Sequence, residues 1–336
     1  MKTIKQFCYV DTLYSLLLYL LVSNINLDET FYFWGENIPE QIRRCFKGCY
    51  LPKRKRNKNK FMDYIEMYKY YKNIKNILEV NNFFNKKIYL QDHLESSFYF
   101  LDKIEECFLI EDGLKNYDEV NLLKINNMNE KIKYNEIFKE KILKGINKKY
   151  KILGLSEKIK KIYLTGITEI PELIKDKVEI INLKEKWEKL SFEEKEEILR
   201  IFDLKNSDLI KWQKLENRIL LITQPLSEDG IISEKEKIEI YKEIVEKNKL
   251  ENIMIKSHPR EKTNYKNIFP NIELIEGKFP LEILMLLGIN FKEVITIFST
   301  AALNFKGRTN VNFIGTENNE HLKEKVGEIK KVYYKI

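Results

Sequence analysis

Short apolar stretches alternate with longer amphipathic stretches along most of this chain. Short apolar runs are typical of buried strands, and apolar positions three and four residues apart are typical of helices. Because strands that alternate with helices form parallel sheets covered on both faces, the pattern predicts an α/β fold. The predicted strands are 4–10, 30–34, 87–90, 107–110, 161–165 and 178–183, then 218–223, 253–256, 272–275 and 293–297.

The strand and helix pattern restarts after residue 205, which predicts two domains. A helix over 190–202, opened by Ser191 and Glu194 at capping-box spacing, leads into the second half. Further helices are predicted at 233–248, at 280–287 and from Thr300. We expect two Rossmann-like domains, 1–205 and 206–336, facing a cleft as in the GT-B architecture, with ligands at the carboxyl ends of the strands. The last helix is a candidate to pack back on the N-terminal domain.

The N-terminal segment imitates a signal peptide, because Lys2 and Lys5 precede the apolar run 13–22. Asp11 favours another interpretation, in which a first strand is followed by an Asp11 N-cap and a buried helix over 12–23. The run is too short to cross a bilayer, which takes about 20 residues. We therefore expect a cytoplasmic protein.

Composition indicates a folded protein with a basic surface. The 336 residues are 43% hydrophobic and 33% charged, with a net charge of +8. Arg43, Arg44 and the basic run 53–60 would attract phosphates or an anionic membrane, although a solvated loop explains the run equally well. No stacking aromatics are interleaved with it, so we expect no nucleic acid partner. The four cysteines lack zinc-finger spacing and fit a reducing compartment.

Acidic residues follow two predicted strands. The strand 107–110 leads into Glu111, Asp112 and Gly113, and the strand 220–223 leads through Gln224 to Glu228, Asp229 and Gly230. A carboxylate at a strand tip is suited to general base catalysis, whereas an N-cap or a turn is the simpler explanation. The base is therefore open between Asp112 and Asp229.

A histidine follows the strand 253–256. His258 lies before Pro259 and between Lys256 and Arg260, where an anionic leaving group would be protonated or stabilised. A surface histidine in a basic turn is the alternative.

Two hydroxyl residues follow the strand 293–297. Ser299 and Thr300 at the start of a helix predict a phosphate site, although plain N-caps would look the same. Glu282, early in the helix 280–287, is placed to hold a ribose diol or to favour the helix dipole.

In this order, the motifs resemble the acidic-acidic-Gly, His-Pro and Ser-Ser/Thr motifs shared by bacterial sialyltransferases. The stretches 224–226, 161–166 and 298–303 resemble glycosyltransferase family 52 in particular, which includes lipooligosaccharide sialyltransferases. The likeness covers most of residues 85–316.

The resemblance implies an inverting transfer of sialic acid from CMP-sialic acid to a terminal galactose hydroxyl of lipooligosaccharide or a similar glycan. It implies Asp112 as the base, with Asp229 as the alternative, and His258 as general acid or electrostatic stabiliser of the leaving CMP. Ser299 and Thr300 would bind the phosphate and Glu282 the ribose, and the backbone around Lys256 and Pro259 would face cytosine. Further substrate-binding residues are expected at Glu111, Gly113, Gln224 and Arg260.

Neither a metal nor a cofactor is expected, because CMP carries a single phosphate and the chain has no Asp-x-Asp motif. The expected partners are the nucleotide-sugar donor, a galactose-terminated or lipid-linked acceptor, an anionic membrane at its cytoplasmic face and a second copy of the chain. A family 52 hexosyltransferase using another nucleotide sugar is the nearest alternative. A non-catalytic polyanion-binding protein is the third.

Overall fold

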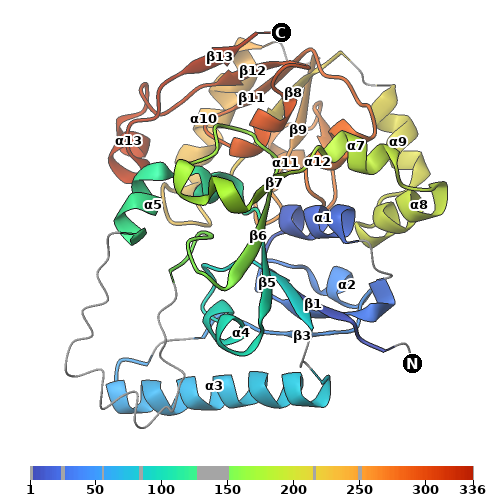
Figure 1. The fold of residues 1–336 in the computed structure, drawn as a ribbon. Helices are drawn as coiled ribbons and strands as arrows, with labels where there is room; N and C mark the ends of the chain where they lie inside the picture. Colours follow the sequence, from blue (N-terminus) through green and yellow to red (C-terminus); the bar gives the residue numbers. More distant parts are fainter. Residues whose placement is uncertain are drawn as a thin grey trace. The chain divides into compact units, whose positions relative to one another are not determined.

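The chain forms two compact units, Met1–Lys189 and Leu190–Ile336 (Figure 1). The computed structural model describes residues 3–23, 27–54, 57–82, 86–126, 151–214, 217–248 and 252–335. The division lies before the helix predicted at 190–202, whereas the sequence pattern placed it near residue 205. This helix and the next one therefore belong to the second unit, where Trp212 packs on Phe279 at a ring-centroid distance of 5.4 Å.

Unit 1 contains a seven-stranded parallel sheet in the order β3-β2-β1-β4-β5-β6-β7. The strands are β1 Gln6–Val10, β2 Thr30–Trp34, β3 Gly48–Tyr50, β4 Lys87–Leu90, β5 Glu106–Ile110, β6 Ile159–Leu164 and β7 Val178–Ile180. The edge strand β3 was not predicted, because its three residues contain no apolar run. The parallel order places the carboxyl ends of all seven strands along one edge.

The helices of unit 1 cover this sheet. They are α1 Leu13–Val22, α2 Glu40–Arg43, α3 Lys60–Val80, α4 Ser97–Lys103, α5 Glu119–Asn126 and α7 Leu183–Glu188, with 3-10 segments at Leu27–Glu29, Gly113–Tyr117 and Glu172–Lys177. Helix α1 is buried over almost all of its surface, which accounts for its resemblance to a signal peptide. Its N-cap is Thr12, whose hydroxyl accepts the Ser15 N–H, so the predicted Asp11 cap is wrong. The Asp11 carboxylate instead accepts two hydrogen bonds from Asn37.

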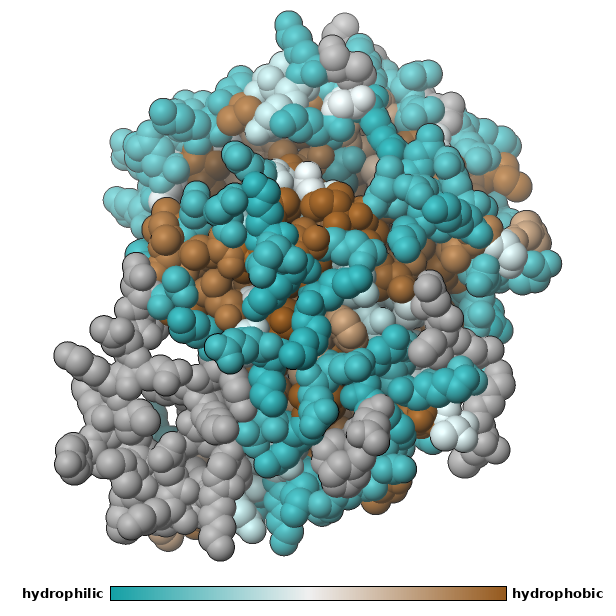
Figure 2. All heavy atoms as spheres, in the orientation of Figure 1, coloured by the Kyte–Doolittle hydropathy of each residue, from teal (hydrophilic) through white to brown (hydrophobic). Residues whose placement is uncertain are grey.

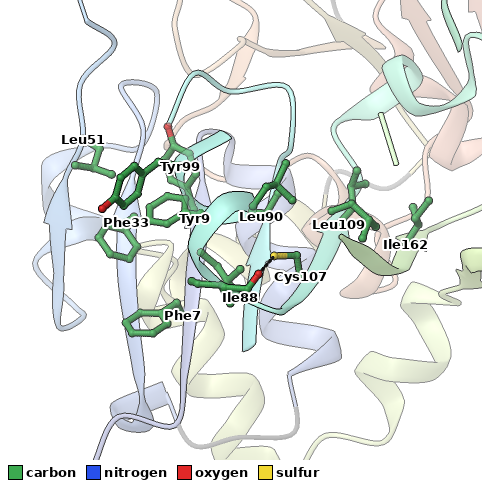
Figure 3. Packing of buried hydrophobic residues seen from close by; sticks show 14 of the residues in the cluster. Phe7, Tyr9, Phe33, Leu51, Ile88, Leu90, Tyr99, Cys107, Leu109 and Ile162 are labelled. Carbon is green, nitrogen blue, oxygen red and sulfur yellow. Dashed lines mark hydrogen bonds between the residues drawn. The ribbon is translucent and has the colours of Figure 1, made fainter. Parts of the chain in front are cut away.

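The core of unit 1 is rich in aromatic side chains. Phe7, Tyr9 and Phe33 from the strands belong to one buried cluster with Leu90 and Tyr99 (Figure 3). Helix α3 joins the same core through one buried stripe, which consists of Tyr71, Ile74 and Leu78.

Unit 2 contains a six-stranded sheet in the order β10-β9-β8-β11-β12-β13. The strands are β8 Ile219–Ile222, β9 Ile253–Lys256, β10 Glu273–Ile275, β11 Glu293–Thr296, β12 Asn310–Phe313 and β13 Val332–Tyr334. All pairs are parallel except β12 and β13, which are antiparallel. The central strands β9, β8 and β11 therefore end side by side.

The helices of unit 2 are α8 Phe192–Ile201, α9 Asn206–Gln213, α10 Glu234–Lys247, α11 Tyr265–Ile268, α12 Glu282–Leu286 and α13 Glu320–Val326. The helix predicted from Thr300 is the 3-10 segment Thr300–Phe305. The last helix, α13, contributes Leu322 to the core of unit 2, and His321 contacts Glu236 of α10.

The face drawn in Figure 2 is hydrophilic over most of its described area, with apolar side chains gathered in patches. Among the helices that the structure describes, none has the length and hydrophobicity that a bilayer crossing requires.

Candidate active site

The carboxyl edge of the unit 1 sheet gathers polar residues from neighbouring strands. His93 follows β4, Asp112 follows β5, and Lys115 lies one turn beyond Asp112. The Asp112 Oδ2 atom lies 3.2 Å from His93 Nε2 and 3.0 Å from Lys115 Nζ. Sequence reasoning missed His93, since nothing local links it to a carboxylate 19 positions later.

Asp112 is poised as an ionised carboxylate. Its burial by itself would raise the pKa, but the His93 hydrogen bond and the Lys115 charge outweigh burial, so the pKa of Asp112 is lowered. Within the described residues, its second oxygen, Oδ1, accepts no hydrogen bond. This oxygen is suited to accept a proton or a hydrogen bond from a ligand hydroxyl.

Glu111 is fully buried and satisfied by protein groups. One oxygen accepts the Tyr14 hydroxyl at 2.8 Å, the other accepts the Tyr117 hydroxyl at 2.9 Å, and Thr165 donates as well. Burial raises the pKa of Glu111. A substrate contact through this carboxylate would break the network, so the arrangement suits a positioning role. Gly113 follows with φ +60, a left-handed conformation that lets the chain turn into the 3-10 segment.

In unit 2, His258 lies just beyond the end of β9. Its Nδ1 atom accepts the backbone N–H of Arg260 at 3.2 Å, so the neutral ring carries its proton on Nε2. Burial, and then the Arg260 charge, lower the pKa of His258 to about 4. The ring is therefore neutral at pH 7 and offers one N–H donor.

A buried carboxylate holds the His258 turn in place. Glu261 Oε1 accepts the His258 N–H at 2.7 Å and the Thr223 hydroxyl at 2.6 Å, and Oε2 accepts the Tyr265 hydroxyl at 2.6 Å. The fully buried Lys237 lies 3.7 Å from Glu261 Oε2. This supporting carboxylate ties the turn to β8 and α11.

Lys237 also joins the second Glu-Asp-Gly stretch to α10, because its Nζ lies 2.8 Å from Glu228 Oε2. Sequence analysis missed this ion pair of Lys237, although the helical pattern of α10 indicates it. Lys237 shares the buried face of α10 with Tyr241 and Ile244, and a lysine at such a position needs an acidic partner.

Asp229, the next residue along this stretch, has a different partner. Its carboxylate pairs with both terminal nitrogens of Arg260, one of them at 3.1 Å. Since Arg260 also donates its backbone N–H to His258, Asp229 and His258 belong to one cluster.

The expected nucleotide-binding residues lie along the same edge. Gln224, at the end of β8, accepts the Phe298 N–H at 2.9 Å and so fixes the segment that leads into Ser299 and Thr300. Both hydroxyl residues are half-buried. The 3-10 segment that follows is only six residues long, so its dipole is weaker than that of the predicted helix.

Glu282 and Lys256, two further motif residues of unit 2, are both buried. Glu282 Oε1 accepts the Asn304 side-chain N–H at 2.7 Å, a partner that the sequence did not indicate. Lys256 Nζ donates to the Gly277 carbonyl at 2.8 Å and lies 4.4 Å from the Phe279 ring centroid. Burial lowers the pKa of Lys256 to about 8.

Comparison with known proteins now decides the family. The sequence model of glycosyltransferase family 52 matches residues 33–316, which is most of the chain. This protein belongs to glycosyltransferase family 52. It is 41% identical over 243 residues to an uncharacterized protein of Haemophilus influenzae, a match that covers 72% of each chain.

Solved structures place this family 52 glycosyltransferase in the GT-B fold. The α/β-galactoside α-2,3-sialyltransferase of Photobacterium phosphoreum is 16% identical with a TM-score of 0.57, over 98% of this chain and 97% of that one. The GT-B domain of a Photobacterium damselae sialyltransferase is 14% identical with a TM-score of 0.56, over 90% and 88%. The two parallel-dominated sheets are thus those of a GT-B glycosyltransferase.

In this glycosyltransferase, the motif residues form two groups. His258, Asp229 and Arg260 are joined by hydrogen bonds at the edge of unit 2, and Gln224 follows the neighbouring strand β8. Asp112 forms the other group in unit 1, with His93 and Lys115. Among the residues that the structure describes, no cluster of three or more His, Cys, Asp or Glu side chains is arranged to hold a metal ion.

Proposed function

We propose that this glycosyltransferase is an inverting sialyltransferase that moves sialic acid from CMP-sialic acid to a terminal galactose hydroxyl of lipooligosaccharide or a similar glycan. The observation that carries the proposal is the alignment of three motifs in unit 2. The stretches that contain His258, Asp229 and Ser299 follow β9, β8 and β11, which are adjacent parallel strands. Ligands of such sheets bind at the carboxyl ends of the strands.

The neutral state of His258 suits a CMP leaving group. The Nε2–H would donate to the donor phosphate, together with the Ser299 and Thr300 hydroxyls. The second pKa of a phosphate monoester is about 6, so CMP departs at neutral pH without being protonated. We therefore favour His258 as a hydrogen-bond donor to the phosphate over a general acid.

The nucleoside would be held by buried groups. The Glu282 carboxylate would accept the ribose hydroxyls, and the backbone at Lys256 and Pro259 would lie against cytosine. The single phosphate needs little added positive charge, so we expect no metal requirement. Activity that is unchanged after treatment with EDTA would agree with this.

The base is Asp112 or Asp229, and the surroundings of the two carboxylates differ. Asp112 has an oxygen without a hydrogen bond in the described residues and a pKa lowered mainly by His93 against burial. Asp229 is paired with Arg260 beside His258. In either case the base removes the proton of the acceptor hydroxyl as its oxygen attacks the anomeric carbon, and CMP leaves from the opposite face.

Replacing His93 distinguishes the two bases. His93→Ala removes the hydrogen bond and the charge that lower the pKa of Asp112, so the acidic limb of kcat/KM moves to higher pH if Asp112 is the base. The measurement is the pH profile with CMP-sialic acid and lactose. An unmoved limb, combined with loss of activity in Asp229→Asn and not in Asp112→Asn, would assign the base to Asp229.

The first test of the function is release of CMP from CMP-sialic acid with and without lactose. Acceptor-stimulated release in the wild type, lost in His258→Ala, supports the proposal. Turnover of a UDP-sugar in place of CMP-sialic acid would assign a hexosyltransferase. Indifference to every nucleotide sugar, with salt-sensitive binding to polyanions, would favour a non-catalytic binding protein.

A further inference from the structure

Helix α3 packs on unit 1 through only one side. Its inner stripe of Tyr71, Ile74 and Leu78 lies in the core, and residues about half a turn away on the helix remain exposed. Figure 1 shows α3 as a long uninterrupted helix. Its outer side is therefore a continuous surface of several turns.

The first turns of this outer side carry large apolar side chains. Phe61 is 71% exposed, Met62 is 43% exposed and Tyr68 is 48% exposed. Single apolar residues are common on soluble proteins, but three of them within about two turns form a small patch. Removing these side chains from water would be favourable.

Lysines surround the patch. Lys58, Lys69 and Lys72 are exposed, and the described residues contain no ion pair that engages them. They extend the basic run, whose members Lys55 and Arg56, and the side chain of Lys60, lie outside the described residues. Arg54 is not part of this free charge, because it is paired with Asp63 and Glu95.

The acidic residues of α3 form no ion pair with these exposed lysines. Asp63 accepts from Arg54, and Glu66 accepts from the Asn57 side chain at 3.3 Å. Glu79 lies near the far end of the helix and pairs with Lys75 at 3.4 Å. Over the side chains that the structure describes, the outer side of the first turns thus combines apolar and cationic groups and presents no exposed carboxylate.

We propose that this α3 face, formed by Lys58, Phe61, Met62, Tyr68, Lys69 and Lys72, binds the surface of an anionic phospholipid bilayer. An interfacial helix lies with its apolar side chains among the acyl chains and its lysines at the headgroups. The lysines match the negative surface potential of such a membrane, and the aromatic and thioether side chains need an apolar layer. A polynucleotide would satisfy the charges and leave Phe61 and Met62 exposed.

The experiment is sedimentation of the full chain with vesicles of phosphatidylcholine, with or without phosphatidylglycerol. We expect binding only to the anionic vesicles, weakened by salt. Each lysine near the surface contributes about fivefold to the partition coefficient, so Lys58, Lys69 and Lys72 changed to Glu should lower it by at least about a hundredfold. The matched control changes Lys235, Lys242 and Lys247, exposed on α10, to Glu and should have a small effect.

Phe61→Ser tests the apolar contribution. In the wild type, membrane binding removes most of the Phe61 ring from water, and the serine variant loses this gain. We therefore expect its partitioning to be about tenfold weaker. Phe192→Ser is its control, because Phe192 is 72% exposed on α8 and lies outside the α3 face. Circular dichroism of each variant checks that the fold is kept.

Equal losses for the two lysine sets, or equal effects of the two phenylalanine variants, would overturn the proposal. A second contradicting outcome is binding to duplex DNA but not to vesicles. In that case the lysine variant would bind DNA more weakly and Phe61→Ser would bind it as the wild type does. The transferase assay with lactose is independent of lipid, so a failure of the proposed function and a failure of this inference give different results.

Discussion

His258 differs from an ordinary surface histidine because a backbone N–H donates to its ring and its pKa is lowered. The Arg260 N–H donates to Nδ1, and the Glu261 carboxylate accepts the His258 backbone N–H. Protonation of Nδ1 would break the first contact and place a second cation beside Arg260. Burial is nevertheless the largest cause of the pKa of about 4, and the Arg260 charge comes second.

This state of His258 predicts a pH profile. Because the ring is neutral above about pH 4, His258 should add no limb to kcat/KM between pH 6 and 8, which reports the free enzyme. His258→Ala should lower kcat/KM by about 10²–10³, the usual loss for one donor to developing charge. His258→Gln, which keeps an N–H donor, should lose less. A wild-type limb near pH 6 that is absent from His258→Gln would contradict the neutral donor.

Among the secondary-structure elements, the return from β12 to β13 depends on a close backbone contact. Gly315 has φ +74, and a Cβ there would lie 2.3 Å from the Ile329 carbonyl oxygen. Its N–H also donates to the Ile297 carbonyl at 2.9 Å. Gly307 has a similar φ of +78, with no atom within 4 Å of such a Cβ.

These two glycines form a matched pair. Gly307→Ala should cost about 1 kcal/mol, the strain of a left-handed alanine. Gly315→Ala should cost about 2 kcal/mol or more beyond this, because the chain before β13 must move. Urea unfolding of both variants measures the difference. Equal free energies of unfolding would show that the contact with Ile329 is loose.

At the scale of the whole molecule, each unit presents its candidate residues along the carboxyl edge of its own parallel sheet. The residues that we propose bind the donor, His258, Glu282, Ser299 and Thr300, all belong to unit 2. A nucleotide bound only there stabilises that unit by mass action, by about 2.7 kcal/mol at a hundredfold excess over Kd.

Hydrogen exchange of the full chain with CMP tests this division. We expect slower exchange in the segments that follow β8, β9 and β11, together with the strands themselves. The amides around Asp112 should change less when CMP is the only ligand. Protection confined to unit 1 would contradict the placement of the nucleotide.

The sequence by itself determined the features that depend on neighbours along the chain. The periodicity of apolar residues located most strands within a few positions, and the predicted capping box of Ser191 and Glu194 is confirmed. Parallel strands put their carboxyl ends together, so the order of strands and polar residues was enough to place the motifs at strand tips. The resemblance to family 52 rested on those same stretches, and the family match confirms it.

Only the tertiary structure decided the chemical state of these motifs. It buried Glu111 among Tyr14, Tyr117 and Thr165, paired Asp112 with His93, and set Glu261 under the His258 turn. Short elements such as β3 and β13 also depended on it, because three residues gain their stability from the neighbouring strand. The pKa of a side chain depends on burial and on charges brought from distant positions, and no local pattern encodes those distances.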